Sequence, residues 1–145
     1  METLPTLSII ERIILLKEVP IFSGLNVDDL AQIARSSTER WYQQGEQLCV
    51  EGEMGKEMFI IASGQVQVVR QVEGKANFLA TRSSGDFIGE MAVIENLPRH
   101  ASVHAVQDTR TLVFGSEMFQ AILRDRPDVA LGVMRELSRR LRAFG

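Results

Sequence analysis

The middle of the chain breaks into short apolar runs separated by glycines, and this pattern limits the folds available to it. Between residues 39 and 115 the separating glycines are Gly45, Gly52, Gly55, Gly64, Gly74 and Gly85. The runs are rich in β-branched and aromatic residues and predict strands at 40–42, 47–50, 58–62, 65–70, 78–81, 101–106 and 110–114. Short strands at near-regular spacing are typical of a sandwich, a jelly roll or a small barrel. Residues 39–115 therefore predict a β-roll.

A helical pattern precedes this zone, over residues 7–37. Ser8 and Glu11 have the spacing of a capping box, which marks the start of a helix. Pro20 ends the first apolar pattern, and Asn26 can cap a second helix. These signals predict N-terminal helices ahead of the β-roll.

A second helical zone, residues 116–144, follows the β-roll, and Pro127 suits the first turn of its terminal helix. The terminal helix carries an apolar stripe at steps of three or four, made of Ala130, Val133, Met134, Leu137, Leu141 and Phe144. Three interpretations of the stripe remain open, namely core packing, a lid over a ligand, and a dimer seam. We expect a single, mainly β domain over residues 1–145, with N-terminal helices and a C-terminal helix pair.

Composition excludes several classes of protein. The 145 residues are 45% hydrophobic and 24% charged, with a formal net charge of -3. These values are ordinary for a globular domain and argue against a disordered chain. The charge balance also argues against a protein whose whole surface binds nucleic acid. Cys49 is the single cysteine, so it makes no internal disulfide, and a reducing compartment fits. Met1 and Glu2 offer no basic leader and no apolar stretch is long enough for a membrane span, so we expect a cytoplasmic protein.

One segment between the expected strands combines groups that suit a small anionic ligand. Residues 89–94 predict a helix of about one and a half turns that begins at Gly89, where free amide groups favour an anion. Arg99 follows Pro98 and can return a planar guanidinium to the same anion. Glu90 is an acceptor and suits a sugar hydroxyl. Together these residues indicate a ligand that holds a sugar and a phosphate in one compact molecule.

This segment resembles the phosphate-binding cassette of the cyclic nucleotide-binding domain family. The family pattern is GDFFGELAL, a short variable loop and PRxATV, while residues 85–103 read GDFIGEMAVIENLPRHASV. The departures include Ile88, Met91 and Ser102. The resemblance runs over residues 19–142, through VPIFSGL at 19–25, QGE at 44–46, EGE at 51–53 and FIIASG at 59–64. It implies the jelly-roll fold of that family.

The resemblance also implies the roles of individual residues. Glu90 would accept the ribose 2′-hydroxyl, and Arg99 would pair with the cyclic phosphate. Backbone groups of Gly89, Met91 and Ala92 would line the phosphate and the ribose. The implied ligand is cyclic AMP, with cyclic GMP as the alternative.

The residues after Arg99 carry the clearest departure from the family. Ala101 would line the other side of the ligand. Family members often have a small residue at the position of His100, and a threonine there is associated with guanine recognition. His100 therefore leaves the base preference open, since it can donate to the phosphate or turn to solvent.

We expect the chain to be a non-catalytic sensor that binds a cyclic nucleotide. Movement of the C-terminal helix would transmit the binding event to an attached effector domain or to a second copy of the chain. The first alternative is a ligand-free interaction module in which Glu90 and Arg99 form an internal salt bridge. The second is a fragment of a transcription regulator, although the chain stops at Gly145 without a winged helix-turn-helix, so we expect no direct nucleic-acid contact. A metal-dependent enzyme lacks support, because His100 and His104 have no third ligand nearby.

Overall fold

Two units make up residues 5–144, the part of the chain that the structure, a computed structural model, describes. One unit holds the described residues up to Ser36 together with those from Gln120 onward, and the other is Ser37–Phe119. The sequence predicts one domain with N-terminal helices over residues 7–37, a β-roll over 39–115 and C-terminal helices over 116–144. These boundaries stay predictions. The absence of a leader inferred from Met1 and Glu2 falls outside the described residues. No helix between residues 5 and 144 is long and apolar enough to cross a membrane.

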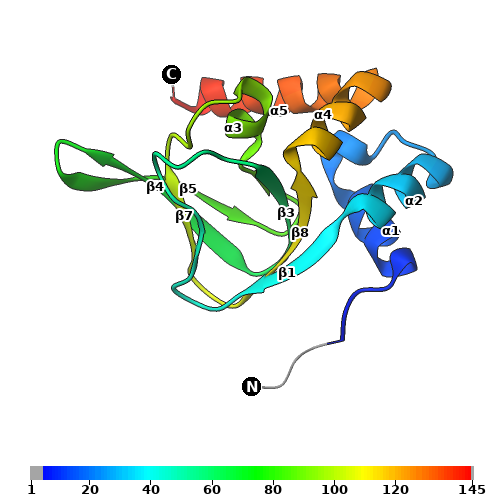
Figure 1. Cartoon of the computed structure of the whole chain (residues 1–145), viewed down its shortest axis with the longest axis horizontal. Coiled ribbons are helices and arrows are strands. Elements are labelled where there is room, and N and C mark those ends of the chain that lie inside the picture. The colour runs from blue at the N-terminus through cyan, green and yellow to red at the C-terminus, as the bar shows by residue number, and fades with distance from the viewer. Residues whose placement is uncertain (1–4, 145) are drawn as a thin grey trace. The chain divides into compact units, whose positions relative to one another are not determined.

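The strands of the second unit form two four-stranded antiparallel sheets (Figure 1). The first sheet has the order β1-β8-β3-β6, with β1 Thr38–Tyr42, β3 Glu57–Ser63, β6 Phe87–Ile88 and β8 Thr109–Gly115. The second has the order β2-β7-β4-β5, with β2 Gln47–Cys49, β4 Gln65–Val72, β5 Lys75–Ser83 and β7 Ser102–Ala105. The mainly β, jelly-roll-like prediction is confirmed, but the described strands form an open roll and not a closed barrel.

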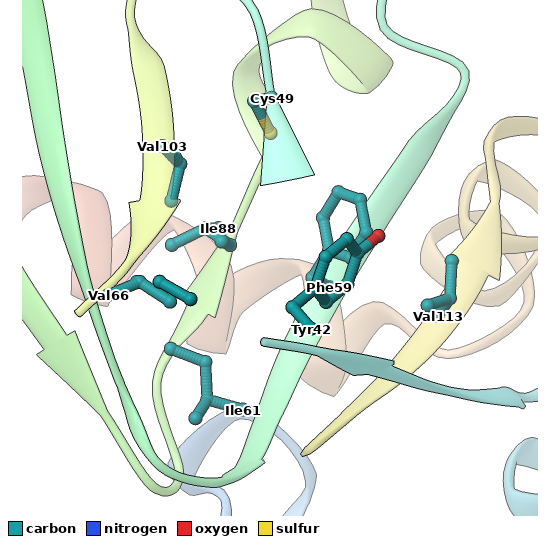
Figure 2. Packing of buried hydrophobic residues seen from close by; sticks show 9 residues of the cluster. Tyr42, Cys49, Phe59, Ile61, Val66, Ile88, Val103 and Val113 are labelled. Atoms are coloured by element: carbon teal, nitrogen blue, oxygen red, sulfur yellow. The ribbon is translucent and has the colours of Figure 1, made fainter. Parts of the chain in front are cut away.

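The two sheets enclose one apolar core (Figure 2). The first sheet contributes Tyr42, Phe59, Ile61, Ile88 and Val113, and the second contributes Cys49, Val66, Val103 and Ala105. Period-two alternation aims these side chains inward, as in β7, where Val103 and Ala105 are buried while their neighbours are half-buried. Burial of apolar surface between the sheets therefore fixes the register of each strand.

The β4–β5 hairpin is longer than the sequence pattern predicts. Glu73 and Gly74 both have a positive φ, 53° and 77°, which suits a two-residue hairpin turn. The ladder reaches Val72 paired with Lys75 at its tip. Residues on both faces of this tip are exposed, so the apolar alternation that marks a strand is absent there. The strand β6 is also missed, because two residues carry no periodicity.

The helices of the first unit begin where the sequence predicts. They are α1 Ile9–Glu18, α2 Val27–Ser36 and α5 Pro127–Phe144, while the short 3₁₀ helix η1 Pro20–Phe22 was not predicted. The Ser8 hydroxyl accepts a bond from the Glu11 amide at 3.1 Å, and the Glu11 carboxylate accepts one from the Ser8 amide at 3.0 Å. Asn26 caps α2 by accepting a bond from the Asp29 amide at 2.8 Å. The helix α4 Ser116–Asp125 starts in the second unit and ends in the first.

Two contacts, one from Arg126 just before α5 and one from Gly132 within it, attach the C-terminal segment to the N-terminal helices within this unit. Arg126 donates to the Asp29 carboxylate at 2.9 Å and to the Gln32 amide oxygen at 2.6 Å. Gly132 faces η1 so closely that a Cβ added to it would lie 3.0 Å from the Ile21 Cα. The glycine therefore allows a close approach of two backbones.

The apolar stripe of α5 divides into two parts. Val133 is buried, but Met134, Leu141 and Phe144 are exposed, the last two at 74% and 72%. Core packing therefore accounts for Val133 but not for Leu141 and Phe144.

We expect Gly132→Val to lower the free energy of unfolding by about 1–3 kcal/mol, because the added methyl groups overpack the contact with Ile21. Urea denaturation measures the change. Gly24→Ala is the matched control, since a Cβ at Gly24 meets nothing within 4 Å. Equal stability of the two variants would show that α5 does not rest on η1.

Candidate anion-binding site around Arg99

The site is built on the turn from β6 into the short helix α3, Glu90–Glu95. The pairing of Ile88 with Phe59 brings the next residue, Gly89, beside the start of β3. Gly89 caps the helix with a φ of 83°, a conformation that favours glycine. The helix ends at Asn96, which also has a positive φ. The predicted helix over residues 89–94 is confirmed, with Gly89 as its cap.

Arg99 returns its guanidinium to this turn, as the sequence predicts. Its Nη1 donates to the carbonyl of Gly89 at 3.1 Å, and its Nη2 donates to the carbonyl of Glu57 at 2.8 Å. The ring of Phe59 lies beneath it, with the guanidinium carbon 5.8 Å from the ring centroid. Carbonyl oxygens are neutral, so these bonds hold the group in place without cancelling its charge.

The loop between β2 and β3 packs against the other side of Arg99. The backbone of Arg99 donates to the Glu53 carbonyl and accepts from the Gly52 amide, both at 2.8 Å. A Cβ added to Gly55 would lie 2.7 Å from the guanidinium carbon and 2.7 Å from the Ala92 Cβ. Gly55 is therefore required for the loop to approach both Arg99 and α3 this closely.

The cassette residues differ in exposure. Glu90 and Ala92 are buried, at 3% and 4%, whereas Met91 is exposed. Ala101 is buried and His100 is exposed. The structure therefore brings Gly89, Glu90, Ala92 and Arg99 together and turns the side chains of Met91 and His100 outward.

The buried Cys49 lies within the electric field of this site. Burial is the main cause that raises the pKa of Cys49 to about 11, and the negative charges of Glu90 and Glu57 raise it further, while Arg99 opposes them. The thiol is therefore protonated at neutral pH. Its position in the apolar core indicates a packing role.

The metal interpretation of the histidines gains no support from their positions. His104 lies in β7, paired in register with Gln47 of β2 and Gln67 of β4. Among residues 5–144, no group of three or more histidine, cysteine or acidic side chains is arranged to hold a metal ion.

The profile of the family described as Cyclic nucleotide-binding domain matches residues 39–126, which include every site residue above. The chain belongs to this family. The recognition made from the cassette residues is therefore confirmed.

Relatives of this cyclic nucleotide-binding domain include a cyclic AMP receptor protein and a protein kinase regulatory subunit. The cyclic AMP receptor protein of Thermus thermophilus is 33% identical over 88% of this chain and 59% of its own length. A cAMP-dependent protein kinase regulatory subunit of Yarrowia lipolytica is 33% identical over 74% of this chain and 28% of its own. The chain thus spans less than two thirds of the length of each of these relatives.

Solved structures share the fold. The Thermus thermophilus catabolite activator protein has a TM-score of 0.78 at 33% identity, covering 86% of this chain and 59% of that one. The regulatory subunit of a cAMP-independent protein kinase A from Trypanosoma cruzi, bound to guanosine, has a TM-score of 0.78 at 27% identity. That comparison covers 88% of this chain and 47% of the other.

Sequence reasoning missed two groups of this cyclic nucleotide-binding domain that hold Arg99. The Glu57 carbonyl has no sequence signal, since any residue offers one. The spacing of Gly52 and Gly55 was a signal for the loop, but nothing in the sequence says that Gly55 faces the guanidinium.

We expect Gly89→Ala to destabilise the domain more than Gly85→Ala. Both glycines have a positive φ, 83° and 89°, so each alanine costs about 1–2 kcal/mol in backbone strain. At Gly89 the new Cβ would also lie 2.6 Å from Arg99 Nη1, while at Gly85 it meets nothing within 4 Å. Arg99 must then leave the Gly89 carbonyl, which costs about 1 kcal/mol more.

Urea denaturation of the two variants measures this difference. The same free energy of unfolding in the two alanine variants would contradict the close approach of Arg99 to Gly89.

Proposed function

We propose that this chain is a non-catalytic sensor domain that binds a cyclic nucleotide, with cyclic AMP as its ligand. The observation that carries the proposal is the guanidinium of Arg99, held by the carbonyls of Gly89 and Glu57 at the start of α3, beside the buried Glu90. A positive group and a carboxylate in one short segment suit a ligand that joins a phosphate to a sugar.

Arg99 is the proposed phosphate ligand. A guanidinium has five N–H donors, and the two carbonyl bonds use only part of this set. The remaining donors suit the exocyclic oxygens of a cyclic phosphate, to which the backbone amides of Met91 and Ala92 add at the first turn of α3. Gly89 allows the ligand to approach the backbone because it has no side chain.

Glu90 is the proposed ribose ligand. Its carboxylate accepts hydrogen bonds, and a 2′-hydroxyl donates one, so the pair suits a ribose and excludes a deoxyribose. Burial of Glu90 strengthens this bond, since a hydrogen bond to a charged group gains strength when water is excluded.

On the other side of the proposed ligand, Ala101 is buried and His100 is exposed, and neither side chain selects between adenine and guanine. Cyclic GMP is the alternative ligand. Guanosine is a third probe, because the Trypanosoma cruzi relative is described as bound to it. A nucleoside has no phosphate, so preference for guanosine would leave Arg99 without a ligand role.

The names of the relatives support a regulatory rather than a catalytic role. We propose an attached effector domain or a second copy of the chain as the partner, and a cytoplasmic location inferred from the single buried cysteine. A ligand-free interaction module is the second candidate, and its cassette would bind none of the three probes.

We expect Arg99→Ala to weaken cyclic AMP binding at least about a hundredfold, because a charge-assisted fork is lost. Glu90→Gln is expected to weaken it about tenfold, since a single charge-assisted bond is lost. Isothermal titration with cyclic AMP, cyclic GMP and guanosine measures these affinities, and Arg99→Lys tests the fork while keeping the charge.

Arg70→Gln serves as the control that removes an exposed positive charge on β4 of the same unit. Equal affinities of the Arg99 and Glu90 variants and the control would refute the site.

Raised salt is expected to reduce the affinity of the wild-type protein modestly, because the ligand is an anion.

We further propose that the signal leaves through α5. The exposed Leu141 and Phe144 support this role, since exposed apolar side chains at a helix end are available for a new contact. Ligand binding would shift the population of α5 conformations that such a contact reads.

Hydrogen exchange tests the relay. We expect cyclic AMP to change the exchange rates of α5 amides in residues 134–144 of the wild-type protein and, at the same ligand concentration, to leave them unchanged in Arg99→Ala. Unchanged rates in a wild-type protein saturated with the ligand would exclude α5 as the output.

A further inference from the structure

Arg40 of β1 forms an ion pair with the side chain of Glu57, the residue whose backbone carbonyl accepts a hydrogen bond from Arg99. Its Nη1 and Nη2 each donate to a carboxylate oxygen of Glu57 at 2.9 Å, in the two-pronged geometry that favours arginine. Nη1 also lies 3.2 Å from the Tyr42 hydroxyl. Since β8 lies between β1 and β3 in the sheet, this pair joins strands that are not neighbours.

Two routes lead from Arg40 to Arg99. In the first, Glu57 accepts Arg40 with its carboxylate and Arg99 with its carbonyl, the latter at 2.8 Å. In the second, the Tyr42 ring packs edge-on against the Phe59 ring, with 6.2 Å between the ring centroids (Figure 2). The guanidinium of Arg99 in turn lies over the Phe59 ring. These contacts connect Arg40 to the anion site.

The charges follow the same order. The hydrogen bond from Arg40 is the main cause that lowers the pKa of Glu57, and the field of Arg99 lowers it further. Glu57 is therefore ionised at neutral pH, and its negative charge lies between two arginines. Arg40 takes the direct bonds, whereas Arg99 interacts with this carboxylate through space.

We propose that Arg40 is a positioning residue for anion binding: by pairing with the Glu57 carboxylate, it keeps that carboxylate from competing for Arg99. The proposal rests on the proposed function, because it assigns the charge of Arg99 to the phosphate of a ligand. Without Arg40, the ionised Glu57 would attract Arg99 and repel an incoming anion. The side chains of Arg40 and Glu57 are 40% and 37% exposed, so solvent screens the effect to a modest size.

Three variants test the proposal by titration with cyclic AMP at neutral pH. We expect Arg40→Gln to weaken binding roughly three- to tenfold, and Glu57→Gln to bind as tightly as the wild-type protein or more tightly. The double variant carries no unpaired carboxylate and is expected to recover wild-type affinity within about twofold. Arg70→Gln again controls for the loss of one positive charge.

The double variant separates charge from structure. An Arg40→Gln affinity equal to that of Arg70→Gln would overturn the proposal. A double variant as weak as Arg40→Gln would also overturn it, because the effect would then run through Tyr42 and Phe59 packing. Thermal unfolding of all four variants shows whether each is folded.

A ligand-independent measurement keeps this test distinct from that of the proposed function. The NMR signal of the Arg99 Nε–H group reports the position of the guanidinium in the free protein. We expect the chemical shift of this signal to change in Arg40→Gln and to return to the wild-type value in the double variant. A wild-type protein that binds no nucleotide would refute the proposed function, while an Arg99 signal that stays fixed in Arg40→Gln would refute the role of Arg40.

Discussion

The hydrogen bonds from one guanidinium to two backbone carbonyls determine how the cassette is organised. Arg99 joins the start of β3, through the Glu57 carbonyl, to the turn before α3, through the Gly89 carbonyl. A carboxylate in either place would hold the arginine more strongly but would also cancel its charge. Neutral acceptors fix the direction of the group and leave its charge for an anion.

This arrangement depends on sheet register and on glycines. The two-residue strand β6 pairs with β3 through Phe59 and Ile88, and a shift by one residue would move Gly89 away from Glu57. Gly55 and Gly89 lack the side chains that would otherwise occupy the space of the guanidinium. The apolar core behind Phe59 therefore supports the site by holding both sheets in register.

The sequence predicts local features well, because they depend on neighbouring residues. The capping box at Ser8 and Glu11, the start of α5 at Pro127 and the short helix after Gly89 are of this kind. The ordered cassette residues also identify the family. Contacts between distant segments were not predictable, since they require the order of the strands. The bond from Arg99 to the Glu57 carbonyl and the ion pair of Arg40 with Glu57 are examples.

The stripe of α5 shows a further limit of periodicity. Val133 and Leu141 belong to the same apolar pattern, yet one is buried and the other is 74% exposed. Helical spacing says which residues share a face, but it does not say how much of that face another segment covers.

A crystal structure of the chain with cyclic AMP would show whether Arg99 binds the phosphate of the ligand. We expect a phosphate oxygen within about 3.2 Å of an Arg99 guanidinium nitrogen, with the carbonyl bonds to Gly89 and Glu57 retained. A nucleotide bound with its phosphate elsewhere, or an Arg99 turned onto the Glu90 carboxylate, would contradict it.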